Sequence, residues 1–429
     1  MSTLNRIQAP EFHAVKHVDL KKSDDLALNN GMPLYMVNAG TQEVMKLEFI
    51  FSGGMRNAQL PIIATAVNDM LDEGTKLRSA MDIAEELDFY GAFIETEVTH
   101  DQASFTLWTL NKYLEPSLEI VNDIIRNAAF PEKEFSIYRN NRKQKYVVDT
   151  DKVSVLARRR FAELLFGDDH AYGKRTHLAD FDKLNTAELN TFHKQYYHAG
   201  NGCILASGNL PANLYDVLNK HFGGNDWKGE INGDIVIAPA LSNTEREHLV
   251  KKDGAMQSAL RVGRVLFNRE HTDFPAMQVL NCALGGYFGS RLMANIREDK
   301  GYTYGIGSGL SSMYGDGYFY ISTEVGVDVT NAALKEVYFE IEKLQQDLIP
   351  DGELELVRNY MTGVFLRSTD GPFAIADRRR ALIGYDLDYS YYDRYLDTIQ
   401  TISASSLRDL AQKYLKKEDL IELVAGDRK

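Results

Sequence analysis

Residues 285–310 read GGYFGSRLMANIREDKGYTYGIGSGL and combine helix, turn and strand signals in a short span. The segment SRLMANIRED predicts a helix that places Leu292 and Ile296 on one face. A turn then leads into YTYGIGSGL, whose small residues favour a strand that another backbone approaches closely. Arg297 and Tyr304 can therefore converge where the helix ends and the strand begins, and together they could donate hydrogen bonds to a carbonyl or an oxyanion. On composition alone, a surface arginine and a core tyrosine are the alternative.

Three segments that follow this stretch are similar to three segments that precede it. Three pairs are similar: 184–197 (LNTAELNTFHKQYY) and 402–415 (ISASSLRDLAQKYL), 203–209 (CILASGN) and 421–427 (IELVAGD), 130–141 (FPEKEFSIYRNN) and 349–360 (IPDGELELVRNY). The pairs share one order and nearly one offset, which predicts two related halves. The segment GGNDWKGEINGD lacks periodicity and is typical of a linker. We therefore expect domains at residues 1–228 and 246–429, joined within 225–246.

Helix and strand signals alternate within each half. Residues 61–73 carry a helical apolar stripe that Gly74 should stop. Ser79 and Asp82 form a variant of the capping box and predict a second helix that ends near Gly91. The segments AFIETEV and ASFTLWTL, separated by a polar THDQ, predict a β-hairpin. This pattern indicates an α+β fold in which each half is a mostly antiparallel sheet covered by helices.

The composition restricts the classes of partner. With 61 acidic and 48 basic side chains the net charge is -13, and such a chain gains nothing from counterion release on nucleic acid. No apolar run reaches the ~18 residues of a membrane span, and the N-terminal residues lack the apolar core of a secretory signal. Cys203 and Cys282 lie in apolar stretches and should be small buried hydrophobes. These features predict a cytoplasmic protein of two to four domains.

Other sequence motifs point to no further chemistry. His13 and His17 have helical spacing, but EFHAVKHVDL alternates like a strand, in which residues i and i+4 stand ~13 Å apart. The segment GDDHAYG (167–173) is expected to form a solvated turn. The glycines at 285–289 and 305–309 match neither GxGxxG nor a P-loop, and no GxSxG elbow occurs, so nucleotide binding and a serine nucleophile are disfavoured.

The pattern GG-x2-GSRL-x4-R-E-x2-G-x2-Y, which begins at residue 285, resembles the C-terminal signature of the pitrilysin/insulinase family of zinc metallopeptidases. That family includes the mitochondrial processing peptidases. The likeness extends over nearly the whole chain, because the two-half repeat, the predicted hairpin and the HAYG tetrapeptide follow in the family's order. In the family, the Arg and Tyr of the signature hold the substrate near the scissile bond. The resemblance therefore gives this role to Arg297 and Tyr304.

The family's zinc site is missing from this sequence. In the family it is an HxxEH helix that ends in a GT-like turn, with a second Glu farther along the chain. Aligning DEGT (72–75) with that turn places Thr65, Asn68 and Asp69 at the ligand positions, and no Glu occurs within 136–147. Such a site needs two imidazoles and a carboxylate for zinc, and a Glu to deprotonate its water. The resemblance thus implies a degenerate zinc site and no cofactor in this chain.

A chain that keeps Arg297 and Tyr304 but lacks the zinc ligands resembles the non-zinc subunit of a two-chain peptidase. The substrate-binding strand also departs from the family, since Glu95, after Gly91, stands where an Asn contacts the substrate backbone. Gly91 and Glu95 remain candidates for substrate binding. The resemblance implies one half of a clamshell, peptide substrates, and a homologous partner subunit that carries the zinc. The alternatives are a non-enzymatic assembly or core subunit and a stand-alone peptide-binding homodimer.

Overall fold

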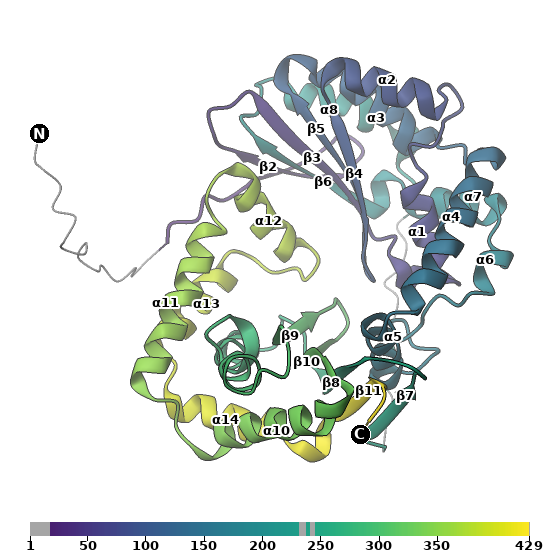
Figure 1. The fold of residues 1–429 in the computed structure, drawn as a ribbon. Coiled ribbons are helices and arrows are strands. Elements are labelled where there is room, and N and C mark those ends of the chain that lie inside the picture. The colour runs from purple at the N-terminus through teal and green to yellow at the C-terminus, as the bar shows by residue number, and fades with distance from the viewer. Residues whose placement is uncertain (1–17, 231–236, 241–244, 429) are drawn as a thin grey trace, which may run out of the picture.

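Two β-sheets lie in separate halves of the molecule, each with helices on its outer side (Figure 1). The computed structural model describes residues 18–230, 237–240 and 245–428. The first sheet contains β1 (Asp24–Ala27), β2 (Pro33–Asn38), β3 (Val44–Phe51), β4 (Phe93–Val98), β5 (Ala103–Leu110) and β6 (Gly202–Gly208). The second contains β7 (Glu247–Lys251), β8 (Gln257–Leu266), β9 (Ile306–Ser312), β10 (Gly317–Gly326) and β11 (Ile421–Gly426).

The two sheets share one strand order, as expected for two homologous halves. The order β2-β6-β3-β5-β4 in the first sheet corresponds to β7-β11-β8-β10-β9 in the second, and β1 extends the first sheet at one edge. In each sheet one pair is parallel, β2 with β6 and β7 with β11, and the other pairs are antiparallel. The predicted α+β class is therefore confirmed. The predicted join at 225–246 falls partly, and His13 and His17 fall entirely, outside the described residues.

Helices connect the strands in both halves. The first half contains α1 (Pro61–Asp69), α2 (Ala80–Tyr90), α3 (Leu114–Asn127), α4 (Glu132–Thr150), α5 (Val153–Phe166), α6 (Asp180–Lys183), α7 (Thr186–Tyr196) and α8 (Leu214–Phe222). The second contains α9 (Phe274–Asn281), α10 (Thr330–Gln346), α11 (Asp351–Arg367), α12 (Pro372–Ile383), α13 (Ser390–Thr401) and α14 (Ala404–Tyr414), with two π-helical turns, η5 (Cys282–Gly286) and η6 (Met293–Asp299). Across the described ranges, no helix is long and apolar enough to cross a membrane.

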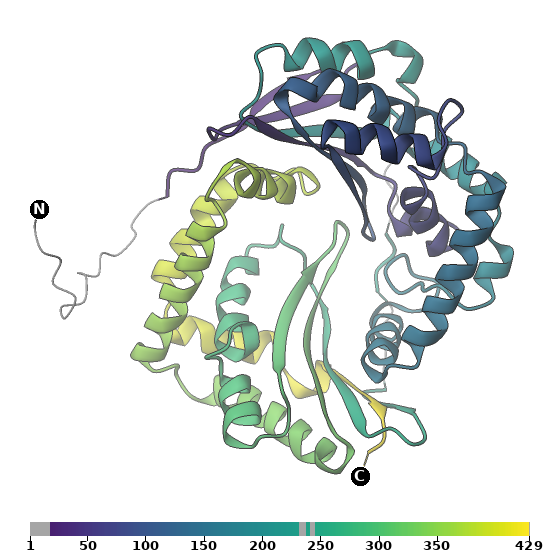
Figure 2. The same ribbon diagram turned by 45° about the horizontal axis from the view of Figure 1, so that its top comes forward.

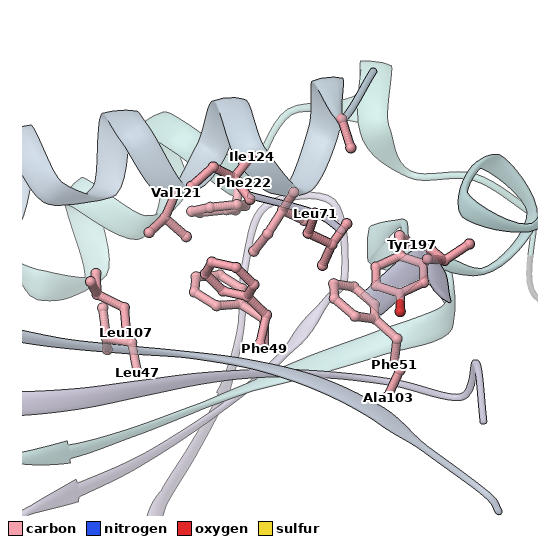
Figure 3. Packing of buried hydrophobic residues seen from close by; sticks show 14 of the residues in the cluster. Leu47, Phe49, Phe51, Leu71, Ala103, Leu107, Val121, Ile124, Tyr197 and Phe222 are labelled. Atoms are coloured by element: carbon pink, nitrogen blue, oxygen red, sulfur yellow. The ribbon is translucent and has the colours of Figure 1, made fainter. Parts of the chain in front are cut away.

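Alternation along the strands divides each sheet into a core face and an inner face. On β3, Phe49 and Phe51 are fully buried in the main core, whereas Lys46 and Glu48 lie on the opposite face. Figure 3 shows Phe49 beneath the helices that cover this sheet, next to Phe222, with ring centroids 4.6 Å apart. The outer helices therefore hold the sheet by apolar burial, and the inner face remains available for polar groups.

Local sequence signals account for the ends of several helices. The Ser79 side chain and Asp82 form both hydrogen bonds of a capping box at the start of α2, and Gly91 ends that helix with φ of 60°. Asn185 caps α7 and Ser403 caps α14. Each side chain accepts a hydrogen bond from the backbone N–H three residues later in the chain. The two similar segments thus form equivalent helices with equivalent caps.

Helix α1 is shorter than its apolar stripe suggests. The sequence predicts a helix to residue 73, but α1 ends at Asp69 and is followed by turns. Gly74 and Thr75 form isolated bridges with Ser79 and Ala128, which place this part of the chain in an extended conformation. The prediction was wrong by about one turn, because residues 70–72 form turns that lead into these bridges.

The segment 167–173 is a turn, but it is not fully solvated as expected. His170 is buried, its ring stacks on Phe166, and its Nε2 lies 2.7 Å from the carbonyl oxygen of Ala238. Tyr172 is buried beside it, whereas Asp168 and Asp169 are exposed. His170 is buried because its ring packs on Phe166 of α5. The prediction of a solvated turn is therefore confirmed for Asp168 and Asp169 only.

Each half contributes a helix to the inner face of the other half's sheet (Figure 2). Helix α5 packs on β8 and β11, where Phe161 and Leu165 share a buried cluster with Leu423. Helix α12 packs on β2 and β6, where Ala376 joins a cluster with Val37. This reciprocal exchange attaches the halves to each other through apolar contacts as well as through the chain.

The tips of two hairpins also meet between the halves. Asp101, between β4 and β5, accepts hydrogen bonds from the Tyr172 hydroxyl (2.8 Å) and the backbone N–H of Tyr314 (3.1 Å). Arg56 pairs with the same carboxylate at 3.1 Å, and Gly315 donates its N–H to the Tyr172 oxygen at 2.9 Å. Asp101 is 6% exposed, so this junction is a buried polar network whose members are paired.

Candidate functional site

The structure brings the helix end and strand start of the 285–310 segment together. Arg297 in η6 donates its Nε–H to the carbonyl oxygen of Tyr304, with a distance of 3.0 Å. Its guanidinium lies over the ring of Phe288, 4.7 Å from the ring centre. Leu292 and Ile296 are fully buried, as the helical spacing predicts. Its Nη1 also lies 3.8 Å from the carboxylate of Glu298, and the Arg297 side chain remains partly exposed.

Hydrogen bonds on both sides of Tyr304 hold its backbone in place. Thr303 donates its hydroxyl to the Glu324 carbonyl of β10 at 2.8 Å, and Thr323 donates to the Gly305 carbonyl at 2.9 Å. The Tyr304 side chain itself is 96% exposed. A tyrosine on an anchored backbone with a free hydroxyl can act as a hydrogen-bond donor to a bound molecule. The alternative of a core tyrosine is wrong for this position.

A cavity of about 460 Å³ opens beside Tyr304. Its lining comes from both halves: Ser154 and Ala157 from α5, Gln257, Ala259, Leu260 and Arg261 from β8, Thr303, Tyr304 and Gly305, and Ser322, Thr323 and Glu324 from β10. The small lining residues, such as Ala259, Gly305 and Ser322, leave backbone accessible on the inner face of the second sheet. The cavity therefore depends on the packing of α5 against the second sheet.

The three residues at the family's ligand positions lie on α1, and a neighbouring helix engages Asp69. Arg142 of α4 places its guanidinium 2.8 Å from the Asp69 carboxylate, and the Tyr138 hydroxyl donates to the same oxygen at 2.9 Å. Burial raises the pKa of Tyr138, and the Asp69 charge adds to that shift, so the phenol stays a donor. One cation and one hydroxyl thus contact Asp69, both at its Oδ2.

Asn68 has a structural role in the core. It is 0% exposed, donates to the carbonyl oxygens of Glu97 (3.1 Å) and Ser104 (3.2 Å), and accepts from the Tyr197 hydroxyl at 2.9 Å. Its amide thereby joins α1 to the β4–β5 hairpin. Thr65 is partly exposed, with its hydroxyl turned to the Pro61 carbonyl at 3.5 Å.

These residues do not fit a zinc ion. Zinc in proteins takes thiolate, imidazole or carboxylate ligands, and Asp69 is the only such group among the three. Its carboxylate already faces the positive charge of Arg142, which would repel a cation at the same place. Nowhere in the described part of the chain do three His, Cys, Asp or Glu residues lie where they could hold a metal ion.

Gly91 and Glu95, the two candidates for substrate binding, lie at the edge of the first sheet. Gly91 ends α2 in the left-handed region and precedes the edge strand β4. Glu95 lies on β4 and accepts a hydrogen bond from the Trp108 indole at 2.9 Å. Both residues are remote in sequence and sheet from Arg297 and Tyr304, and the structure does not bring the two sets together within one cavity.

Sequence reasoning missed three residues that shape these sites. Tyr138 and Arg142 lie one helical turn apart on α4, a spacing that could have suggested a shared face. No local signal connects that face to Asp69. Arg261 on β8 also gives no motif, and its place in the cavity depends on strand pairing with β10.

Two family models match the chain over most of its length. The model described as insulinase, peptidase family M16, matches residues 57–166, and the model described as the peptidase M16 inactive domain matches residues 183–361. The first range contains α1 and the edge strand β4, and the second contains Arg297 and Tyr304. Both characteristic regions of the sequence thus lie within one family.

Similar proteins and structures agree with this assignment. An uncharacterized zinc protease, YmxG, of Bacillus subtilis (strain 168) is 22% identical over 405 residues, which cover 92% of this chain and 96% of that protein. An uncharacterized zinc protease of Rickettsia felis is 24% identical, covering 77% and 79%. The crystal structure of a peptidase M16 inactive domain from Pseudomonas fluorescens superposes with a TM-score of 0.85 at 22% identity, covering 95% of this chain and 98% of that one. A protease from Helicobacter pylori gives the same TM-score at 19% identity, covering 95% and 100%. Because both models describe one peptidase family and match residues 57–166 and 183–361, this chain belongs to the pitrilysin/insulinase family, peptidase family M16.

Proposed function

We propose that this chain is the non-zinc subunit of a heterodimeric zinc metallopeptidase that degrades or processes peptides. In this proposal, Arg297 and Tyr304 orient the substrate and stabilise the oxyanion that forms at the zinc of a homologous partner subunit. The proposal depends on the contrast between the Tyr304 site and the Asp69 site. Tyr304 is exposed beside a cavity, whereas Asp69 is engaged by Arg142 and Tyr138.

The chemistry of the pair supports this role. A guanidinium and a phenol are both hydrogen-bond donors at neutral pH, which is what a carbonyl oxygen needs as negative charge builds up on it. Arg297 uses its Nε–H on the Tyr304 carbonyl, so the helix end and the strand start act as one rigid unit. The edge strands β4 and β9 could add sequence-tolerant backbone pairing to an extended peptide, with Gly91 and Glu95 near the first of these edges.

The proposal assigns the zinc to the partner and no cofactor to this chain. We expect the two chains to work together in the cytoplasm, each supplying half of a closed clamshell. The purified chain by itself should hold no stoichiometric zinc and cleave no peptide, because Thr65, Asn68 and Asp69 are poor or occupied ligands.

The test is co-expression with a homologous chain that carries HxxEH, followed by a peptide-cleavage assay. Tyr304→Phe deletes one exposed hydroxyl and should lower turnover of the complex by ~10²–10³, without changing thermal stability or partner binding. Arg297→Lys keeps the charge but loses the planar fork and should also be impaired. Tyr360→Phe on α11 is the matched control, because it removes a hydroxyl that lies outside the Tyr304 cavity. Unchanged cleavage by both site variants would leave the pair structural and would favour the assembly-subunit alternative.

A further inference from the structure

Arg261 lines the cavity beside Tyr304 and has no acidic partner among the described residues. It lies on β8 opposite Ser322 of β10, on the inner face of the second sheet, with its guanidinium 5.5 Å from the ring centre of Tyr320. The inner face of the first sheet is different, because Lys46 and Arg380 both pair with Glu48 there, at 2.9 and 3.0 Å. A partly buried arginine without a carboxylate is therefore a distinctive feature of the Tyr304 cavity.

The permanent charge that acts on Arg261 is a second cation. Burial lowers the pKa of Arg261, and the positive charge of Arg158 on α5 adds to the effect, while Tyr318 and Tyr320 act in the opposite direction. Arg158 is exposed and comes from the other half of the chain. Arg158 lies one residue beyond Ala157, which lines the Tyr304 cavity, and its positive charge is unfavourable for Arg261 unless an anion lies close to both.

Arg158 also lines a neighbouring cavity of about 390 Å³ that is basic overall. Its other charged lining residues are Arg142, Lys145, Arg159 and Asp149. Asp149 is already paired with Lys152 at 2.8 Å. In a chain of net charge -13, helix α5 thus carries positive charge between two adjacent cavities. The charge is local and is not a consequence of the composition.

The form of the cavity favours a carboxylate on an extended chain. An arginine presents a planar pair of N–H donors that matches a carboxylate in a bidentate manner. Glu324 lines the same cavity, and its negative charge disfavours an ion with two charges, such as phosphate. Gly305, next to Tyr304, leaves backbone accessible for a peptide whose carboxylate reaches Arg261.

We infer that Arg261, assisted by Arg158, forms a carboxylate-binding subsite beside Tyr304, so that the peptides bound by this chain carry an acidic side chain or a free C-terminal carboxylate there. The inference rests on the proposed function, since it names the class of peptide that Arg297 and Tyr304 would orient. Arg261 is a specificity-determining residue in this scheme and takes no part in bond cleavage.

Fluorescence anisotropy with the full-length chain tests the subsite with three labelled peptides of one length. The first contains a single Glu and an amidated C-terminus, the second replaces that Glu by Gln, and the third is the Gln peptide with a free C-terminal carboxylate. At least one carboxylate peptide should bind about tenfold or more tightly than the neutral one, as expected for a hydrogen bond to a charged group. Comparison of the first and third peptides identifies the source of the carboxylate.

Arg261→Gln should abolish this preference and leave the affinity for the neutral peptide unchanged. Arg158→Gln, at an exposed position, should reduce the preference and remains informative if Arg261→Gln lowers the melting temperature. Lys335→Gln on α10 is the matched control, because it removes one exposed positive charge outside both cavities. Equal binding of all three peptides, or a preference that survives in Arg261→Gln, would overturn the inference.

The outcomes separate this inference from the proposed function. Peptide binding without a charge preference, in a chain that activates a zinc-bearing partner, would overturn the subsite alone. A preference that depends on Arg261, in a chain that activates no partner, would support the subsite and overturn the proposed function. If no peptide bound to the chain or to its complex, both would be wrong.

Discussion

Asp69 shows how far the identity of a single residue defines its chemistry. A carboxylate can bind a metal, but here it accepts from Tyr138 and pairs with Arg142, so its charge is compensated within the protein. The neighbouring Asn68 has become a core residue that joins α1 to a hairpin. Both side chains thus take part in contacts that stabilise the fold.

His193 is a second residue whose environment determines its behaviour. The ring is buried on α7, donates its Nε2–H to the Ile125 carbonyl at 2.8 Å, and stacks on Tyr197. Burial lowers the pKa of His193 from 6.5 to about 4, although the Ile125 hydrogen bond acts in the opposite direction. Since only a donor satisfies a carbonyl, Nε2 carries the proton in the neutral ring.

This shift predicts a loss of stability at mildly acidic pH. Between pH 6.5 and about 4 the unfolded chain binds a proton at His193 that the folded chain does not, so the free energy of unfolding falls as the pH drops through this range. The contribution is about 3 kcal/mol in total. His193→Gln, which keeps an N–H donor, should flatten the pH dependence by that amount in denaturant unfolding. His177→Gln, at an exposed histidine, is the control, and equal pH profiles for both variants would contradict the argument.

At the scale of elements, helix α4 determines whether α1 can be a metal site. Tyr138 and Arg142 lie one turn apart on α4 and both reach Asp69. The corresponding helix of the second half, α11, makes a different contact: its Glu353 forms a bidentate ion pair with Arg291, just before η6, with N–O distances of 2.7 and 2.9 Å. Equivalent helices have thus acquired different contacts in the two halves.

Restoring the three ligands on α1 should not restore a zinc site. In the variant Thr65→His, Asn68→Glu, Asp69→His, Arg142 would still place a positive charge at the site and the distal Glu would still be absent. The Asn68→Glu change would also direct acceptor oxygens at the Glu97 and Ser104 carbonyls, where an amide donor is needed, at a cost of about 1–3 kcal/mol. We expect a lower melting temperature, no tightly bound zinc by elemental analysis and little peptidase activity.

A double variant, Thr65→His with Asp69→His, separates the two effects. It leaves Asn68 in place, so its melting temperature should exceed that of the triple variant, and it should also hold zinc weakly. If the triple variant cleaved peptides efficiently and a chelator abolished that cleavage, neither Arg142 nor the missing distal Glu would prevent zinc binding.

At the scale of the whole molecule, two kinds of contact hold the halves together. Helices α5 and α12 bury apolar surface on the opposite sheet, and the hairpin tips form the buried network around Asp101. The apolar contacts supply most of the free energy, because the hydrophobic contribution grows with buried area. The Asp101 network adds polar contacts between the hairpin tips of the two sheets.

Asp101→Ala should therefore weaken the docking of the halves. It removes the acceptor for the Tyr172 hydroxyl and the Tyr314 N–H and leaves Arg56 buried without its partner, a loss of about 3–5 kcal/mol. Amide hydrogen exchange should show faster exchange in both hairpin tips. Asp226→Ala is the control, because it also breaks an Asp–Arg pair but at an exposed site, where little stability is lost. Equal effects of the two variants would show that the junction is not a structural link.

Features that depend on near neighbours could be predicted from the sequence. The capping box of Ser79 and Asp82, the β4–β5 hairpin and the helix with Leu292 and Ile296 all depend on residues a few positions apart. The end of α1 and the burial of His170 could not, because they involve residues far away in the sequence: Thr75 bridges to Ala128, and the His170 ring contacts the Ala238 carbonyl oxygen. The roles of Arg297, Tyr304, Gly91 and Glu95 stay predictions.

The sequence by itself determined the family, the two related halves and the absence of an HxxEH motif, because motifs and repeats are properties of the order of residues. Only the tertiary structure decided that Arg142 meets Asp69, that α5 crosses to the second sheet, and that Arg261 lies beside Tyr304 with no ion pair to a described residue. The physical reason is the range of the interactions. Helix caps and turns act within a few residues, whereas charge pairing and burial depend on which distant segments the packed core brings into contact.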